Sequence, residues 1–345
     1  MSVPGSSIEG SRWFAPLDGV RALAATVVLA SHVQATPVPT GTLAVWVFFG
    51  LSAFLLTGKF VSDSAAFSSA GLGRYVLRRA FRILPMYAVF VLVYGLILGD
   101  RHYIRDNLFH FHGNGHLWTI NQELFFYAVL PVVSVAVLPL RRWPLVAAGS
   151  LVMASVWARG HLDANVVKVR AETGWTNVYF APFLLGMAAA YVAPLARAHG
   201  HRVGPILAAL VSAAFVGAFL YLGATMAPMT GPAADNTVEV GLLVAALLVW
   251  LVAAPANWLT HVLSNRVLRQ VGLAGFSFYL WHWAVFTLRP AWVDEWGLFP
   301  LCWLATAAMA QATYYLVERP GIAVGERLTR SRPPCRFGQC ERGFG

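Results

Sequence analysis

Residues 42–61 read TLAVWVFFGLSAFLLTGKFV, a run with a single charged side chain, Lys59. About 20 apolar residues in a helix cross the hydrocarbon core of a bilayer, which is about 30 Å thick. Lipid offers the backbone no hydrogen-bond partner, so a spanning segment is either a helix or a strand of a closed barrel. This run is too long for a barrel strand and therefore predicts a transmembrane helix.

Comparable apolar runs recur along the chain and predict about ten spans. They cover residues 17–33, 42–61, 83–99, 117–139, 143–158, 176–195, 204–226, 238–254, 271–288 and 298–317. Of the 345 residues, 58% are hydrophobic and 12% are charged, whereas a soluble domain carries about 25% charged residues. This composition excludes the water-soluble, disordered and fibrous classes. We therefore expect an all-α, polytopic integral membrane protein.

Basic residues are distributed unevenly between the connections that join these spans. Sixteen of the 25 Lys and Arg residues lie in the second, fourth, sixth and eighth connections or after the last span, against six in the odd connections. Cytoplasmic loops carry the excess of Lys and Arg, so both termini are expected in the cytoplasm. The net charge of +10 then reflects topology in the inner (plasma) membrane and indicates no nucleic-acid partner.

The predicted organisation is one helical bundle over residues 1–320, followed by a basic, flexible cytoplasmic tail over residues 321–345. We find no internal repeat, and we expect no secretory signal peptide in residues 1–14. The three cysteines, Cys302, Cys335 and Cys340, are too few and too irregularly spaced to predict a disulfide framework.

The first span carries three ionisable residues, Asp18, Arg21 and His32. Such residues are costly inside a membrane and are functional candidates by default. Arg21 and His32 are eleven positions apart, so they share one helix face at an axial separation of about 16 Å. In the alternative interpretation, Asp18 and Arg21 form a structural pair and His32 reaches the interface.

Two further segments carry charge at or within spans. Residues 74–82 hold four arginines, which suit a phosphate because guanidinium binds it through two parallel hydrogen bonds. A topology signal or binding of anionic lipid explains the same cluster. Glu123 lies within the fourth span and needs a partner or a proton there. The alternative is a structural link to an arginine of another helix.

Three motifs are weaker. His282 lies between two tryptophans in residues 275–286, where packing is the alternative to a functional role. His110, His112 and His116 have no acidic or cysteine partner at zinc spacing, so we expect no metal. We interpret Glu318, Arg319 and Pro320 as a structural pair that ends the last helix.

Six segments together resemble the motifs of the membrane-bound acyltransferase 3 family, which O-acylates bacterial glycans, symbiotic signals and antibiotics. In chain order they are LDGVRALAATVVLASH, VFFGLSAFLLTG, RRAFRILPMY, WTINQELFFY, GFSFYLWHWAVF and VERP, from Leu17 to Pro320. The departures at Gly50, Ala53 and Ala284 remove no polar group. We also expect the chain to lack the esterase-like domain of some members and to complete the transfer alone or with a separate partner.

The resemblance implies acyl-CoA as co-substrate, with no permanently bound cofactor, and a hydroxyl acceptor on a glycan, a carbohydrate or a natural product such as an antibiotic. His32 is implied as the general base, or as a nucleophile that forms an acyl-imidazole, and Glu123 as the catalytic residue that orients it. The substrate- and donor-binding residues are then Asp18, Arg21, Arg79, Arg82, Tyr127, Tyr279 and His282.

Two other functions stay open. Buried Arg, His and Glu side chains also suit a transporter or flippase for a lipid-linked or anionic substrate. Inverted repeats are common in transporters, and none is detectable in this sequence. A lipid-binding or sensory membrane protein without chemistry is the third possibility, and it predicts that His32 and Glu123 are replaceable by neutral residues.

Overall fold

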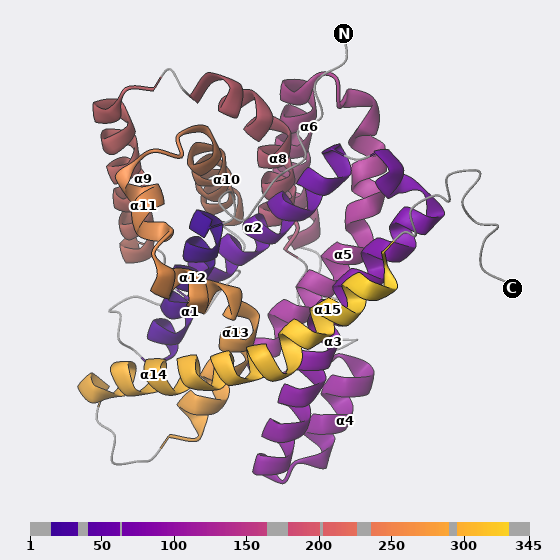
Figure 1. Cartoon of the computed structure of the whole chain (residues 1–345), viewed down its shortest axis with the longest axis vertical. Coiled ribbons are helices and arrows are strands. Elements are labelled where there is room, and N and C mark those ends of the chain that lie inside the picture. The colour runs from indigo at the N-terminus through magenta and orange to yellow at the C-terminus, as the bar shows by residue number, and fades with distance from the viewer. Residues whose placement is uncertain are drawn as a thin grey trace, which may run out of the picture.

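The computed structural model describes residues 15–33, 41–62, 64–163, 179–200, 203–225, 236–289 and 295–330. Within these ranges the chain is almost entirely helical and contains no strand (Figure 1). The α-helices are α1 Ala15–His32, α2 Gly41–Ser62, α3 Ser69–Leu98, α4 Arg101–His110, α5 Trp118–Val137, α6 Pro144–Ala158, α8 Ala181–Gly200, α9 Pro205–Thr225, α10 Thr237–Ala253, α11 Trp258–Leu263, α12 Arg266–Leu273, α13 Gly275–Thr287, α14 Glu295–Thr313 and α15 Arg319–Leu328. Short 3₁₀ turns cover Ser64–Phe67, Gly115–Leu117 and Leu138–Leu140, and π-turns cover Arg159–Asp163 and Tyr314–Glu318.

Every predicted span overlaps one of these helices. By length and composition, five candidate spans among the described residues can cross a membrane: Gly41–Val61, Ser69–Leu98, Arg101–Leu140, Ala181–Gly200 and Pro205–Thr225. Helix α10 is apolar but shorter. An all-helical, multi-pass membrane fold is therefore confirmed, while the count of ten spans and the cytoplasmic side of the termini remain predictions.

Two predicted connections are helical. The arginine segment before the third span belongs to α3, which begins after the N-cap Ser68 and continues through Pro85. The connection expected at residues 100–116 forms α4, whose N-cap Asp100 accepts a hydrogen bond from the backbone N–H of Tyr103 at 2.9 Å. Side-chain caps satisfy the free N–H groups at both helix starts. The arginines of α3 are consequently held on a rigid helix.

Helix α2 lies at the centre of the bundle and packs against α1, α8 and α10. Figure 1 shows α3 and α4 as a projecting hairpin, and α14 and α15 as one long yellow rod across the bundle. Helix α1 packs in turn against α11, α12 and α13. The first span is thus enclosed by segments that are far from it in sequence.

Glycines bring three of the helix pairs into backbone contact: α8 with α2, α12 with α1, and α1 with α11. A Cβ at Gly186 of α8 would overlap the carbonyl oxygen of Gly50 in α2, one of the positions that depart from the family pattern. A Cβ at Gly272 of α12 would overlap the carbonyl oxygen of Asp18, and one at Gly19 would overlap that of Leu263. Small residues permit such close approach between membrane helices.

The sequence interpretation expected the last helix to end at Pro320, but the helix continues past this residue. A π-turn at Tyr314–Glu318 leads directly into α15, where Pro320 occupies the first turn and interrupts no hydrogen bond. Glu318 is buried and accepts a hydrogen bond from Ser277 Oγ at 2.7 Å. None of the salt bridges of the described residues joins it to Arg319, so the predicted pair is wrong.

The tail expected to be flexible begins as the helix α15, which packs against α3. Gly321 and Gly325 approach Phe81 of α3 closely, and Arg78 Nε donates to Thr329 Oγ1 at 2.7 Å. The remainder of the tail, with Cys335 and Cys340, lies outside the described residues.

The close approach of α8 to α2 predicts that Gly186→Ala destabilises the bundle by about 1–3 kcal/mol, because the new methyl group meets backbone. Gly217→Ala in α9 is the matched control. No heavy atom lies within 4 Å of its added Cβ, so it should be neutral or stabilising by about 0.5–1 kcal/mol. Thermal unfolding in detergent measures both, and equal midpoints would contradict the proposed importance of this contact.

Candidate functional site

A cavity of about 390 Å³ opens among α1, α2, α3, α5, α12 and α13. Of the nine residues predicted for the site, seven line it: Asp18, Arg21, Arg79, Arg82, Glu123, Tyr127 and Tyr279. Four helices that are distant in sequence contribute these side chains. The fold therefore gathers most of the predicted site at one place, and His32 and His282 are the two that do not line the cavity.

Arg21 is fixed at the cavity wall by its own helix and by α12. Its Nη1 donates to Asp18 Oδ1 at 2.9 Å and lies 3.5 Å from the carbonyl oxygen of Gly272. The structural pairing of Asp18 with Arg21 is thus present. Guanidinium has five N–H donors, so these contacts leave donors of Arg21 for a ligand in the cavity.

Glu123 is held by hydroxyl groups and not by an arginine. Ser52 Oγ of α2 donates to its Oε1 at 3.0 Å, and the Tyr127 hydroxyl donates to the same oxygen. None of the salt bridges of the described residues involves Glu123, so no direct ion pair links it to an arginine of another described helix. The guanidinium of Arg79 lies 5.8 Å from the ring centroid of Tyr127, which connects the carboxylate to the arginines of α3.

His32 has a defined tautomer in its neutral form. Its Nδ1 lies 2.7 Å from the carbonyl oxygen of Val28, and a carbonyl only accepts, so Nδ1 carries the hydrogen and Nε2 the lone pair. Within the described part of the chain, Nε2 makes no hydrogen bond. The ring lies 5.1 Å from that of His282 and 5.2 Å from that of Trp283, between centroids.

His116 joins this group, which sequence reasoning missed. It is buried, stacks on Trp283 at 5.5 Å and lies 5.2 Å from His282. Neither of its ring nitrogens has a hydrogen-bond partner among the described residues. We call His32, His116 and His282 the histidine cluster. The sequence held one indication of this position. His116 lies at the start of the fourth span, and the start of that span is expected on the same side of the membrane as His32.

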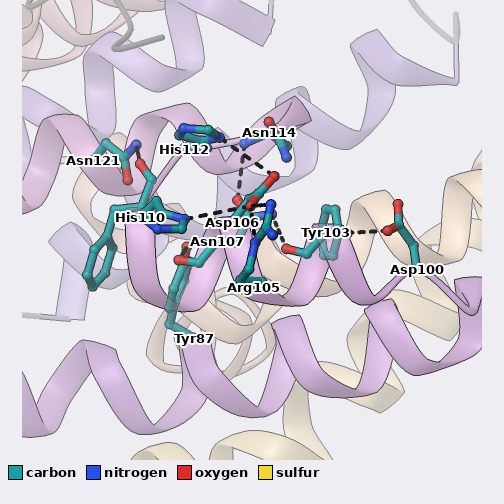
Figure 2. A network of polar contacts seen from close by, with 11 residues as sticks. Tyr87, Asp100, Tyr103, Arg105, Asp106, Asn107, His110, His112, Asn114 and Asn121 are labelled. Carbon is teal, nitrogen blue, oxygen red and sulfur yellow. Dashed lines mark hydrogen bonds and ion pairs between the residues drawn. The ribbon is translucent and has the colours of Figure 1, made fainter. Parts of the chain in front are cut away.

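The other two histidines of the HFHGNGH segment lie elsewhere. Figure 2 shows His110 and His112 pointing toward Asp106, with Nδ1 atoms 3.6 and 3.9 Å from its carboxylate oxygens. The side chains of His110 and His112 are exposed, and that of Asp106 is partly exposed. The three histidines grouped in the sequence analysis therefore do not form one cluster.

A network of asparagines shapes the loop that delivers His116 (Figure 2). Asn107 is fully buried; its Nδ2 donates to the Tyr103 carbonyl at 2.9 Å, and its Oδ1 accepts from the backbone N–H of Asn114 at 3.2 Å. Asn121 donates to the carbonyl of Phe111, a residue with a positive φ of 50°. The loop conformation is thus fixed by side chains of α4 and α5.

Tyr279 connects the cavity to the histidine cluster. Its ring lies 5.2 Å from His282 and 5.6 Å from His116, while the same residue lines the cavity. Its hydroxyl donates to the His116 carbonyl at 2.7 Å and accepts from Thr119 Oγ1 at 2.8 Å. Glu123 and His32 share no hydrogen bond, and the role of Glu123 in orienting His32 or sharing its proton stays a prediction.

Two basic residues at the cavity, Lys59 and Arg269, were not predicted as site residues. Sequence reasoning counted Arg269 as a topology signal. Its place beside residues 271–288, a span with functional candidates, was the one indication of a second role.

Comparisons with known proteins agree with these motifs. Residues 14–316 match the family model described as an acyltransferase domain (acyltransferase 3). The chain is 26% identical to the putative peptidoglycan O-acetyltransferase YrhL of Bacillus subtilis, over 90% of this chain and 55% of the relative. It is 25% identical to the peptidoglycan O-acetyltransferase OatA of Listeria monocytogenes, over 89% and 54%. The chain spans about half the length of these relatives, and no solved structure gives a significant match.

The asparagine network predicts that Asn107→Ala loosens the loop at residues 111–117. Two partly buried hydrogen bonds are lost, which costs about 1–3 kcal/mol of local stability, and the amide hydrogens of the loop should exchange faster. Asn114→Ala is the control, because the Asn114 side chain is exposed and makes no cap hydrogen bond. Hydrogen exchange measured by mass spectrometry in detergent tests this, and equal exchange in both variants would contradict it.

Proposed function

Since the chain belongs to the acyltransferase 3 family, we propose that it transfers a short acyl group, acetyl in the simplest case, from acyl-CoA to a hydroxyl group of a glycan. The relatives named as peptidoglycan O-acetyltransferases favour a glycan acceptor over an antibiotic or another natural product. We place the reaction at the plasma membrane, with the donor entering from the cytoplasm.

The observation that carries this proposal is the position of Arg21 and His32 on α1. Arg21 lies in the wall of a cavity that also holds Arg79 and Arg82, which suits the phosphates of CoA. His32 is eleven residues further along the same helix, an axial distance of about 16 Å. The pantetheine arm is long and thin, so it reaches from the arginines toward the histidine cluster past Tyr279.

In the first mechanism, His32 Nε2 accepts the proton of the acceptor hydroxyl as its oxygen attacks the thioester carbonyl. The carbon–sulfur bond then breaks, and the imidazolium returns the proton to the CoA thiolate. The products are the ester and free CoA. In the second, Nε2 attacks the carbonyl itself and expels the CoA thiolate. The acceptor hydroxyl then attacks the acyl-imidazole, which regenerates Nε2, and the hydroxyl proton passes to the thiolate. Both use the nitrogen that the contact with Val28 leaves available.

Glu123 is assigned a positioning role on the cavity side. Its carboxylate accepts from Ser52 and Tyr127, and the Tyr127 ring faces Arg79. Loss of the carboxylate releases Tyr127 and therefore changes the surroundings of Arg79. We expect Glu123→Gln to raise the KM for acyl-CoA more than it lowers kcat.

His32→Ala should lower kcat by about 10²–10⁴-fold, because the general base is lost, while the protein stays folded. His199→Ala is a matched control. Its Nδ1 lies 2.9 Å from the carbonyl four residues earlier, the same local contact as in His32, but on the exposed end of α8. Release of the CoA thiol by the purified protein, with acetyl-CoA and a soluble glycan, is the measurement.

Wild-type transfer by His32→Ala would show the assigned role of His32 to be wrong. If the wild-type protein releases no thiol from acyl-CoA with any acceptor, the result would favour the alternative function as a transporter or flippase.

A further inference from the structure

The cavity has an excess of positive charge that the proposed function has not fully used. Five basic side chains line it, Arg21, Lys59, Arg79, Arg82 and Arg269, together with two carboxylates, Asp18 and Glu123. One carboxylate is paired with Arg21 and the other is hydrogen-bonded by hydroxyl groups. Arg79, Arg82 and Arg269 therefore form no salt bridge among the described residues.

Two of these arginines have buried nitrogens without a partner. The Nε atoms of Arg79 and Arg269 are both inaccessible to solvent and make no hydrogen bond within the described part of the chain. Buried donors are nearly always paired in folded proteins, and an exception needs an explanation, of which a water, an ion or a ligand as acceptor is one. Their cavity makes an anionic ligand the natural source of that acceptor.

The two arginines approach the cavity from different helices. Arg79 is on α3, which packs against α4 and α15, whereas Arg269 is on α12, which packs against α1. Arg79 lies over the Tyr127 ring, while Arg269, like Arg82 of α3, interacts electrostatically with Asp18 of α1. The ligand is consequently expected to present negative charge to both α3 and α12.

The arrangement of the arginines on each wall of the cavity indicates which phosphate groups of the ligand they bind. Arg79 and Arg82 are three residues apart on one helix face, about 5–6 Å between Cβ atoms, which suits two adjacent phosphates. Arg269 is a single guanidinium and suits one phosphate, bound through two parallel hydrogen bonds. We propose that Arg269 binds the ribose 3′-phosphate of the CoA nucleotide, while Arg79 and Arg82 bind its diphosphate. This assignment rests on the proposed function.

The test compares acetyl-CoA with 3′-dephospho-acetyl-CoA as donors for the purified full-length protein. In the wild type, removal of the 3′-phosphate should raise KM about tenfold or more and leave kcat nearly unchanged. Arg269→Gln should raise the KM for acetyl-CoA to the same level and have equal KM values for the two donors. Arg269→Lys, which retains the charge but not the planar fork, should keep part of the preference.

Arg266→Gln is the matched control. Arg266 is one turn before Arg269 on α12, is exposed and does not line the cavity, so this variant should discriminate between the donors as the wild type does. An Arg269→Gln protein that still prefers acetyl-CoA, or a wild type without any preference, would overturn the assignment.

A direct binding measurement separates this inference from the proposed function. Calorimetry with adenosine 3′,5′-bisphosphate and 5′-AMP reports on the 3′-phosphate without any turnover. The wild type should bind the bisphosphate more tightly, and Arg269→Gln should bind both equally. Should the wild type bind the bisphosphate preferentially but release no thiol from acetyl-CoA, the proposed function fails and the phosphate site stands. If the wild type releases thiol from acetyl-CoA but shows no preference for the 3′-phosphate, the proposed function stands and the phosphate site fails.

Discussion

The backbone contact between α1 and α12 is the constraint on which the site depends. Gly272 admits the carbonyl of Asp18 so closely that no side chain fits between the helices. Because of this approach, Arg21 contacts both Asp18 and the Gly272 carbonyl, and Arg269 reaches the same cavity from the opposite helix. A bulkier residue at position 272 would separate α1 from α12 and with it the two walls of the cavity.

The sequence was sufficient for the fold class because apolar runs and the bilayer thickness leave few solutions. It also identified most of the charged residues that line the cavity, since charge inside a span is costly and rarely incidental. Boundaries were less predictable. Hydropathy started the third span at residue 83, whereas a capping serine and the amphipathic arginine segment extend α3 back to Ser69.

Sequence reasoning missed the residues whose role depends on contacts between segments that are distant in sequence. Arg269 flanks a span, where a basic residue is ordinarily a topology signal. His116 was grouped with its neighbours His110 and His112, although the loop turns at three positive-φ residues between His110 and His116. Glu318 was paired with the adjacent Arg319, but the π-turn directs it to Ser277 of α13. The spacing of residues along the sequence does not predict these tertiary contacts.

The position of Tyr279 has a consequence for the whole of the acyl-CoA donor that we propose. On one side of this residue the walls carry guanidinium groups, and on the other the ring contacts are among imidazole, indole and phenyl groups. A polyanionic nucleotide is stabilised on the first side and would lose its counter-charges on the second. The uncharged thioester end has no such preference. For the acyl-CoA donor that we propose, the difference in charge between the two sides of Tyr279 therefore sets how far the molecule enters the bundle.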